Sequence, residues 1–359
     1  MFFPPSGKVL DTGSRSKPCK SCDYWSKQDQ TSARYKQWKK DHAKECTATH
    51  TGSSGSMEAA AAVDIFKRSI ENNNLRYTRF IGDGDTNSFS KVSESKPYGE
   101  SDPPLPQKVE CVGHVQKRMG TRLRKLKTSW GSRKMSDGKT IGGAKRLTKK
   151  KIDYIQVMYG NAIREHSQDL EGMWKAIWAI FFHTLSTNKD PKHGLCDVSW
   201  CKYLQKKAEN KEKEYDHHPL PLPIMKEIKP IFTDLTDKTL LRKCLDGLSQ
   251  NANESFNNLI WSICPKNKYH GLQTVDTAVG LSVVIFNDGM QGLFSVFENL
   301  QLDLGSSAKA QFLKMDRLRF KKAETKATQA TKDARRARRR AKLGLSDKQD
   351  SSAYASGSH

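Results

Sequence analysis

Residues 77–81, Tyr-Thr-Arg-Phe-Ile, form a short run of aromatic and β-branched side chains that Gly82 and Gly84 bring to an end. This pattern predicts a short buried strand. Asp83 and Asp85 then follow the carboxyl end of a core strand, which is the edge where ligands gather in open α/β sheets. Carboxylates at such an edge can hold Mg²⁺ or Mn²⁺. A solvated turn is the competing interpretation, so the motif gains weight only from residues elsewhere in the chain.

The charge of the chain narrows the class of partner. Its 359 residues, enough for about two domains, include 62 lysines and arginines against 39 aspartates and glutamates, a net charge of +23. Such an excess favours a polyanionic partner, and nucleic acid is the default one. No run of about 18 apolar residues is present, so no membrane span is expected. The first residues lack the features of a secretory signal, and no motif points to a small-molecule substrate.

Four residues with metal-ligand spacing lie in the first 50 positions, as Cys19-x2-Cys22 and His42-x3-Cys46. Cysteines in an intracellular-looking chain are better interpreted as thiols or metal ligands than as disulfides. A helix through His42 and Cys46 would put both on one face, and the Cys-x2-Cys pair would complete the tetrahedral set that structural zinc prefers. His50 is an alternative ligand. The competing interpretation is that these are four unrelated thiol and imidazole groups that share no metal ion.

Hydrophobic spacing predicts helices in most of the remaining chain. The alanine-rich stretch 57–72 is expected to point Ile65, Phe66 and Ile70 inward. From residue 148 onward, apolar residues recur at helical spacing in two successive helices, which indicates a helical bundle. These positions are Ile152, Ile155, Tyr159 and Ile163, followed by Leu170, Met173, Ile177 and Ile180.

Two basic stretches predict contact with a nucleic-acid backbone. The segment 117–151 mixes lysine, arginine and glycine around Trp130, and the block 334–342 is typical of a nuclear-localisation signal or a nucleic-acid arm. A solvated face is the competing interpretation of the first. The candidate DNA-binding residues are Lys117, Arg118, Arg122, Arg124, Lys125, Arg335, Arg336, Arg338, Arg339 and Arg340.

Two further features have open interpretations. His193, Cys196 and Cys201 form a second Cys/His group, with His217 and His218 downstream. The spacing is irregular, so either a metal site or ordinary packing could account for the group. Glu254 is expected in the first turn of a helix, where an acid often only offsets the helix dipole.

Taken together, these stretches resemble the Mutator-like transposase domain of animal mobile elements, from Gly7 to about Arg319. The residues that carry the resemblance are GKVLD at 7–11, CxxC at 19–22, W-x3-H-x3-C ending at Cys46, GSSGSME at 52–58, RYTRFIGDGDTNSF at 76–89, ECVGHVQKRMGTRLR at 110–124, AIWAIFFHTLST at 176–187, HGLC and SWCKY within 193–203, and CLDGLSQNANESFNNLIW at 244–261.

The resemblance implies an RNase H-like (integrase-like) α/β fold, with a mixed sheet, a small zinc-stapled module and a large helical insertion. It also implies a D-D-E set of acids that hold two Mg²⁺ or Mn²⁺ ions for DNA strand cleavage and transfer in the nucleus. Asp83 matches the second Asp, with Asp85 as the alternative, and Glu254 matches the Glu. The Cys-x2-His motif of the family matches Cys111 and His114, and Asn257 shares a helix face with Glu254.

The first Asp of the family belongs to a strand before residues 7–11, which themselves are predicted to end a strand. Asp11 lies on that later strand, so it is at the wrong place to substitute. We therefore expect a chain that is truncated at its N-terminus and incomplete as a catalyst. Either the gene model is truncated or the strand with the first Asp has really been lost. The alternative is a domesticated or degenerate nuclear DNA-binding protein without catalysis. An RNA-associated basic protein has support from charge alone, and assembly into a homo-oligomer stays open.

The expected organisation has four parts. Residues 1–115 would be a partial RNase H-like core with the zinc module at 19–50. Residues 116–249 would be the helical insertion with its basic stretch, and 250–300 the part of the core that carries the catalytic helix. Residues 301–359 would be a charged helix and a basic, disordered tail.

Overall fold

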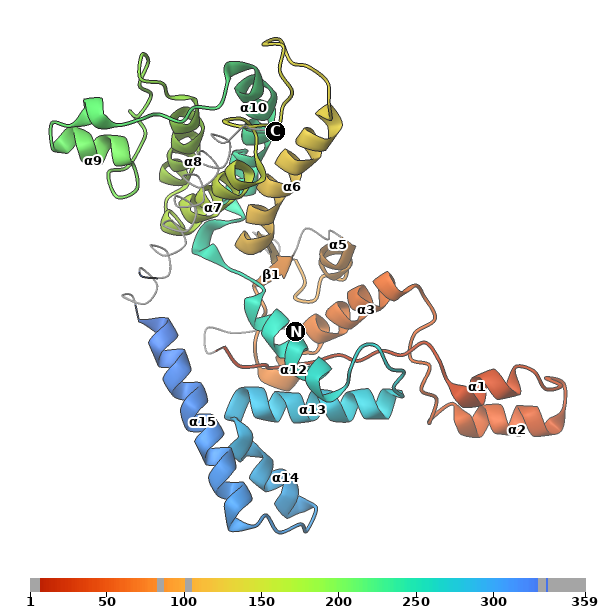
Figure 1. The fold of residues 1–359 in the computed structure, drawn as a ribbon. Coiled ribbons are helices and arrows are strands. Elements are labelled where there is room, and N and C mark those ends of the chain that lie inside the picture. Colours follow the sequence, from red (N-terminus) through yellow and green to blue (C-terminus); the bar gives the residue numbers. More distant parts are fainter. Residues whose placement is uncertain (1–6, 83–86, 101–104, 329–333, 335–359) are drawn as a thin grey trace, which may run out of the picture. The chain divides into compact units, whose positions relative to one another are not determined.

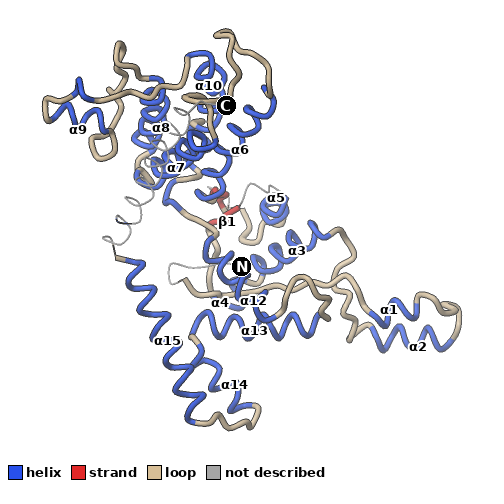
Figure 2. Tube along the Cα trace, viewed as in Figure 1, coloured by secondary structure: helices blue, strands red, loops and turns tan. Residues whose placement is uncertain are grey.

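The computed structural model describes residues 7–82, 87–100, 105–328 and 334. It is mostly helical, with one small sheet (Figure 2). The chain divides into two compact units, one from residues 1–80, 85–108 and 250–327, the other from 81–84, 109–249 and 328–359. None of the described helices combines the length and the hydropathy that crossing a membrane requires.

The first unit contains two groups of helices that are separated in sequence. Its helices are α1 (Lys20–Trp25), α2 (Ala33–His42), α3 (Ser54–Lys67), α4 (Ser69–Asn73), α5 (Asn87–Glu94), α12 (Asn251–Ile263), α13 (Leu272–Asp288), the short η3 (Met290–Gly292), α14 (Leu293–Asn299) and α15 (Ser306–Ala327) (Figure 1).

Two short parallel strands begin in the first unit and end in the second. Strand β1 (Arg79–Gly82) covers the end of the run that predicted a strand, and β2 (Gln107–Glu110) pairs with it. The backbone N–H of Gln107 donates to Thr78 O (2.9 Å), and that of Cys111 donates to Gly82 O (3.0 Å), so the pairing runs to the last residue of β1. Apart from an isolated bridge, the described residues form no other sheet. The RNase H-like assignment therefore remains a proposal.

Aromatic packing between α3 and its neighbours forms a small core in the first unit. Phe66 and Ile65 are buried there with Tyr77, as the helical spacing predicted. The expectation for Ile70 was wrong, because 43% of its surface is exposed. The helix breaks at Arg68, whose backbone leaves helical geometry (φ −88°, ψ 2°), so α4 does not continue the apolar face of α3.

The predicted strand end at residues 7–11 was also wrong. This segment has no strand, and Val9 instead exchanges two hydrogen bonds with the side-chain amide of Asn287 in α13. Val9 is buried with Phe256 and Ile260 of α12, which form a second small core in the first unit. Both backbone groups of Val9, which a partner strand could have satisfied, are thus paired with one side chain.

The second unit is a helical bundle. Its helices are α6 (Val112–Trp130), α7 (Lys149–Glu165), α8 (Leu170–Leu185), α9 (Lys202–Ala208), α10 (Leu222–Leu235) and α11 (Lys238–Arg242), with the short turns η1 (Glu212–Glu214) and η2 (Leu245–Gly247). Every apolar position predicted to face inward on α7 is at most 1% exposed, and on α8 all but the half-buried Leu170 are buried. The sequence-based prediction of a buried bundle is confirmed.

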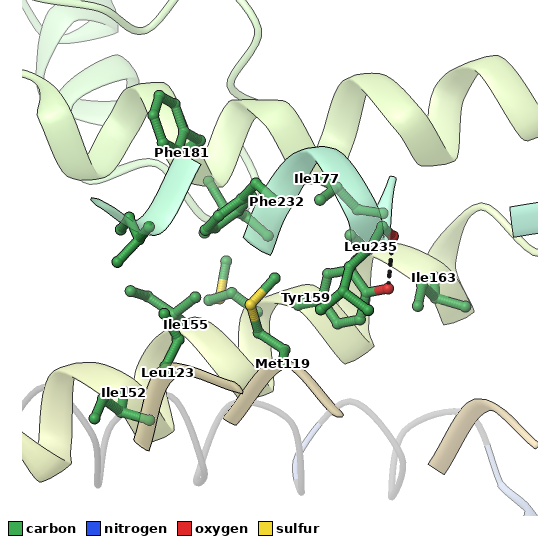
Figure 3. Packing of buried hydrophobic residues seen from close by; sticks show 14 of the residues in the cluster. Met119, Leu123, Ile152, Ile155, Tyr159, Ile163, Ile177, Phe181, Phe232 and Leu235 are labelled. Atoms are coloured by element: carbon green, nitrogen blue, oxygen red, sulfur yellow. Dashed lines mark hydrogen bonds between the residues drawn. The ribbon is translucent and has the colours of Figure 1, made fainter. Parts of the chain in front are cut away.

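Tyr159 lies in the main core of this bundle, completely buried between α6, α7, α8 and α10 (Figure 3). Its hydroxyl donates to the backbone carbonyl of Leu235, 2.9 Å away, at the end of α10. The last carbonyls of a helix have no partner within the helix. This hydrogen bond therefore satisfies a group that the apolar core would otherwise leave unpaired.

Candidate metal centre and nucleic-acid interface

Cys19, Cys22, His42 and Cys46 converge on one point in the first unit. His42 Nε2 lies 3.3 Å from both Cys19 Sγ and Cys22 Sγ, and Cys22 Sγ lies 3.5 Å from Cys46 Sγ. All four ligand atoms lie within 4.8 Å of one another. A tetrahedral zinc ion with its usual bond lengths holds sulfur and nitrogen about 3.6 Å apart and two sulfurs about 3.8 Å apart. The cluster could hold a zinc ion, as the spacing predicted.

The helices around these four residues differ from those that the sequence predicted. Cys19 caps the start of α1 and Cys22 lies within that helix. Helix α2 ends at His42, so Cys46 lies in the following segment and not one turn further along the helix. The i,i+4 argument was therefore wrong, although its ligand set is the one observed. His50 lies outside the set and has its Nε2 2.8 Å from Ser56 Oγ.

Stacked aromatic rings orient the histidine of this cluster. Trp38 stacks on Trp25 (5.0 Å between centroids) and on His42 (4.9 Å), and its Nε1 donates to Ser21 Oγ. In residues 16–50, all described, Cys19 is the one buried side chain. A segment of this length without an apolar core needs another source of stability, and a structural metal is the usual one.

The thiols of the metal-free cluster differ in acidity. Burial raises the pKa of Cys19, but hydrogen bonds from the Cys22 backbone and from Thr47 outweigh it and lower that pKa to about 5. Burial and the thiols of Cys46 and Cys19 raise the pKa of Cys22 to about 12. A bound cation would stabilise all three thiolates, so binding would release protons from this cluster.

Of the acids in the expected D-D-E set, Glu254 lies within the described residues. Asp83 and Asp85 lie outside the described residues. Glu254 is exposed in the first turn of α12, and Asn257 is exposed three residues further on. Asp11, the misplaced candidate, accepts two hydrogen bonds from the guanidinium of Arg68 (2.6 and 2.8 Å), which occupies both of its carboxylate oxygens.

Cys111 and His114 lie where strand β2 passes into helix α6. Cys111 is buried and is the N-cap of α6, and its N–H bonds to the last residue of β1. The Nδ1 atom of His114 is buried with no hydrogen-bond partner in the described structure. Backbone pairing thus places the Cys-x2-His motif beside Gly82, the residue immediately before Asp83.

Helix α6 has one apolar face and one basic face. Val115, Met119 and Leu123 are fully buried, and the expected DNA-binding residues lie on the other sides of the helix. Lys117 and Lys125 are exposed, with no ion pair among the described residues.

The arginines of α6 have carboxylate partners. Arg118 forms a partly buried ion pair with Glu110 (2.6 Å), whose side chain is only 7% exposed. The ion pairs of Arg122 with Asp234 (3.0 Å) and Arg124 with Asp153 (2.9 Å) are more exposed. Arg118 therefore has a structural role, while the other two can exchange their partners for phosphate at little cost. Arg335, Arg336, Arg338, Arg339 and Arg340 lie outside the described residues.

A family model of Mutator-like transposases matches residues 4–201, more than half of the sequence. The chain belongs to the Mutator-like transposase family. Comparison with curated proteins gives no match, and comparison with solved structures gives none either. The matched region of this Mutator-like transposase chain contains the cluster of Cys19, Cys22, His42 and Cys46, both strands and α6. Glu254 and helix α12 lie beyond it.

A second ligand cluster lies in the helical unit of this family member. His183, His193, Cys196 and Cys201 have ligand atoms that all lie within 4.8 Å of one another. The sequence grouped His193, Cys196 and Cys201, with His217 and His218 as the downstream histidines, but did not indicate His183. His183 lies in α8, whose sequence has the pattern of an apolar helix. The folding of the chain places it next to His193, Cys196 and Cys201 in the segment after α8.

Burial also perturbs the acidity of this second cluster. Burial lowers the pKa of His193 and also that of His217. A hydrogen bond from Cys196 is the main cause that lowers the pKa of Cys201 to about 4, and the same contact raises the pKa of Cys196. A Cys201 thiolate therefore disfavours deprotonation of Cys196.

Proposed function

We propose that this Mutator-like transposase chain acts on DNA by metal-dependent strand cleavage and transfer in the nucleus. The family match over residues 4–201 carries the proposal. In this scheme Asp83 or Asp85, together with Glu254, holds Mg²⁺ or Mn²⁺ within an RNase H-like core. When bound there, such ions would supply activation of the attacking water or 3′-hydroxyl and stabilisation of the leaving oxygen at phosphorus.

Two features of the structure support the proposal. The Cys-x2-His motif pairs through Cys111 with the end of β1, next in sequence to the proposed acid Asp83. The exposed side of α6 presents Lys117 and Lys125, which are available to DNA phosphates. Phosphate contacts of this kind give affinity and register without reading sequence.

The zinc cluster has a structural part in this proposal. We assign Cys19, Cys22, His42 and Cys46 to one zinc ion that folds residues 16–50, because that stretch buries no apolar side chain of its own. Three cysteines and one histidine close the tetrahedron, so no position remains open for a substrate. The ion therefore acts on folding and not on chemistry.

Nicking of supercoiled plasmid DNA in Mg²⁺ or Mn²⁺ tests the cleavage proposal. The cleavage proposal predicts that the wild-type chain converts supercoiled into open-circular DNA and that Glu254→Gln reduces this conversion to the background of a no-protein sample. A chain that is incomplete as a catalyst would give that background already in the wild type. Glu298→Gln, also an exposed glutamate of the first unit, is the matched control and should retain activity. Nicking that is equal in all three proteins would refute the role of Glu254.

The second candidate function is DNA binding without catalysis. The position of Glu254 favours it, because an exposed acid in the first turn of a helix is commonly present only to offset the helix dipole. This candidate predicts salt-dependent DNA binding and no nicking in either metal. The plasmid assay, paired with a binding measurement on the same protein, separates the two functions.

A further inference from the structure

We propose a second zinc site in the helical unit, formed by His183, His193, Cys196 and Cys201. The distances between ligand atoms support it first. His183 Nδ1 lies 3.2 Å from His193 Nδ1, and the four nitrogen–sulfur distances range from 3.5 to 3.8 Å. A tetrahedral zinc ion with two nitrogen and two sulfur ligands sets these separations at about 3.3 and 3.6 Å. These five distances thus match the corresponding edge lengths of a zinc tetrahedron.

A hydrogen-bond chain behind His193 leaves its inner nitrogen able to bind a metal. The side-chain oxygen of Asn188 accepts from the backbone N–H of His217 (3.2 Å) and lies 2.6 Å from His217 Nδ1, which must therefore be the protonated nitrogen. His217 Nε2 then accepts from His193 Nε2, 2.9 Å away. This fixes the proton of His193 on Nε2 and its lone pair on Nδ1, the atom inside the cluster. Such an outer hydrogen bond is characteristic of metal-bound histidine.

The same chain explains why His217 is not itself a ligand. Its two ring nitrogens are both committed, one to Asn188 and one to His193. Ser186 Oγ also lies 2.9 Å from His193 Nε2, and it accepts the backbone N–H of Lys192. His217 therefore belongs to the shell that orients a ligand, in the place where sequence reasoning had put a ligand.

Burial in the connection between α8 and α10 gives an independent argument. Residues 187–219, all of which the structure describes, bury only two side chains, those of His193 and Cys201. Helix α9 buries none, and Leu195 and Val198 are exposed. A connection this long rarely keeps a defined path without a core of its own. The two buried residues are both members of the cluster, so a metal would supply the missing core.

Aromatic rings close the site against water. Tyr203 stacks on His193 (4.2 Å between centroids) and Trp200 meets the edge of His183 (5.0 Å). Two thiolates and two imidazoles with no open position are a structural zinc set, and softer or larger ions fit it less well. A zinc ion here would fix the α8–α10 connection to the last turn of α8 through His183.

Zinc content of the purified chain tests this inference. We expect about two zinc ions per chain, one for each cluster, and a loss of about one ion on changing Cys196→Ser or Cys46→Ser. The double variant should contain none. Cys264→Ser changes a buried cysteine outside both clusters and should keep both ions. One ion in the wild type, with none left in Cys46→Ser, would overturn the second site.

A measurement on the unmodified protein keeps the test independent of variants that fold poorly. The first cluster has three sulfur ligands and one nitrogen, and the second has two of each. Zinc X-ray absorption should therefore report an average of about 2.5 sulfur ligands per ion when both sites are loaded. An average of about three sulfurs, with one zinc per chain, would show that the first site alone binds and would refute the proposal.

Discussion

Replacing Tyr159 by phenylalanine tests the hydrogen bond at the centre of the helical bundle. The change removes one oxygen atom from a completely buried ring and leaves the packing of that ring in place. The backbone carbonyl of Leu235 at the end of α10, 2.9 Å from the hydroxyl that is removed, would then lose this hydrogen bond. A buried acceptor left without a partner costs about 1–3 kcal/mol. We expect Tyr159→Phe to lower the free energy of unfolding of the bundle by this amount.

Amide hydrogen exchange measured by mass spectrometry suits this prediction, since it reports on the bundle separately from the other unit. A loss of 1–3 kcal/mol should speed exchange in the most protected peptides of α7 and α10 by roughly 5- to 150-fold. Tyr269→Phe, a change at a tyrosine with 64% of its surface exposed, is the matched control and should alter exchange less than twofold. Equal exchange in the two variants would refute the reasoning about Leu235.

Three further outcomes follow from ion pairs and metal ligands. Chelation of zinc should unfold residues 16–50, and limited proteolysis would then reveal new cleavage in this segment. Resistance to proteolysis that survives complete metal loss would contradict the structural role of the zinc ion. Arg118→Ala should lower the free energy of unfolding of the bundle, measured in urea, by about 3 kcal/mol, because Glu110 is left buried without its partner. A decrease of less than about 0.5 kcal/mol, as at exposed ion pairs, would contradict a stabilising role of this pair. A hydrogen bond from Arg146 lowers the pKa of Asp137, so the pair stabilises the fold above about pH 4 and loses that effect as pH falls through the lowered pKa. Asp137→Asn should flatten acid unfolding in that window, and an unchanged pH profile would argue that the pair contributes nothing.

Local patterns in the sequence were enough to predict the bundle. Ile152, Ile155 and Ile163 recur at helical spacing because one face of α7 meets the core, and no distant information is needed to see it. The stripe of Val115, Met119 and Leu123 carries the same signal on α6, although lysines and arginines surround it in the sequence. That helix could have been predicted from the residues alone.

Other features depend on contacts that are distant in sequence. The break at Arg68 accompanies its ion pair with Asp11, so no local pattern shows that Ile70 turns outward. The ligand set at Cys19 was predicted because metal ligands follow a known spacing, whereas His183 joins its cluster from the last turn of α8. Residues 7–11 have strand-like composition, yet the backbone of Val9 pairs with the side chain of Asn287, 278 positions away in the sequence.

Equilibrium binding of the wild-type chain to a fluorescent DNA duplex, measured by anisotropy as salt rises from about 50 to 200 mM, tests most directly the claim that this protein engages DNA. Phosphate contacts from Lys117 and Lys125 alone give a slope near −1.8, so affinity should fall by at least roughly tenfold, and each Lys→Ala change should reduce the slope by about 1. Binding whose affinity stays constant over that range, or no binding at 50 mM, would contradict the account.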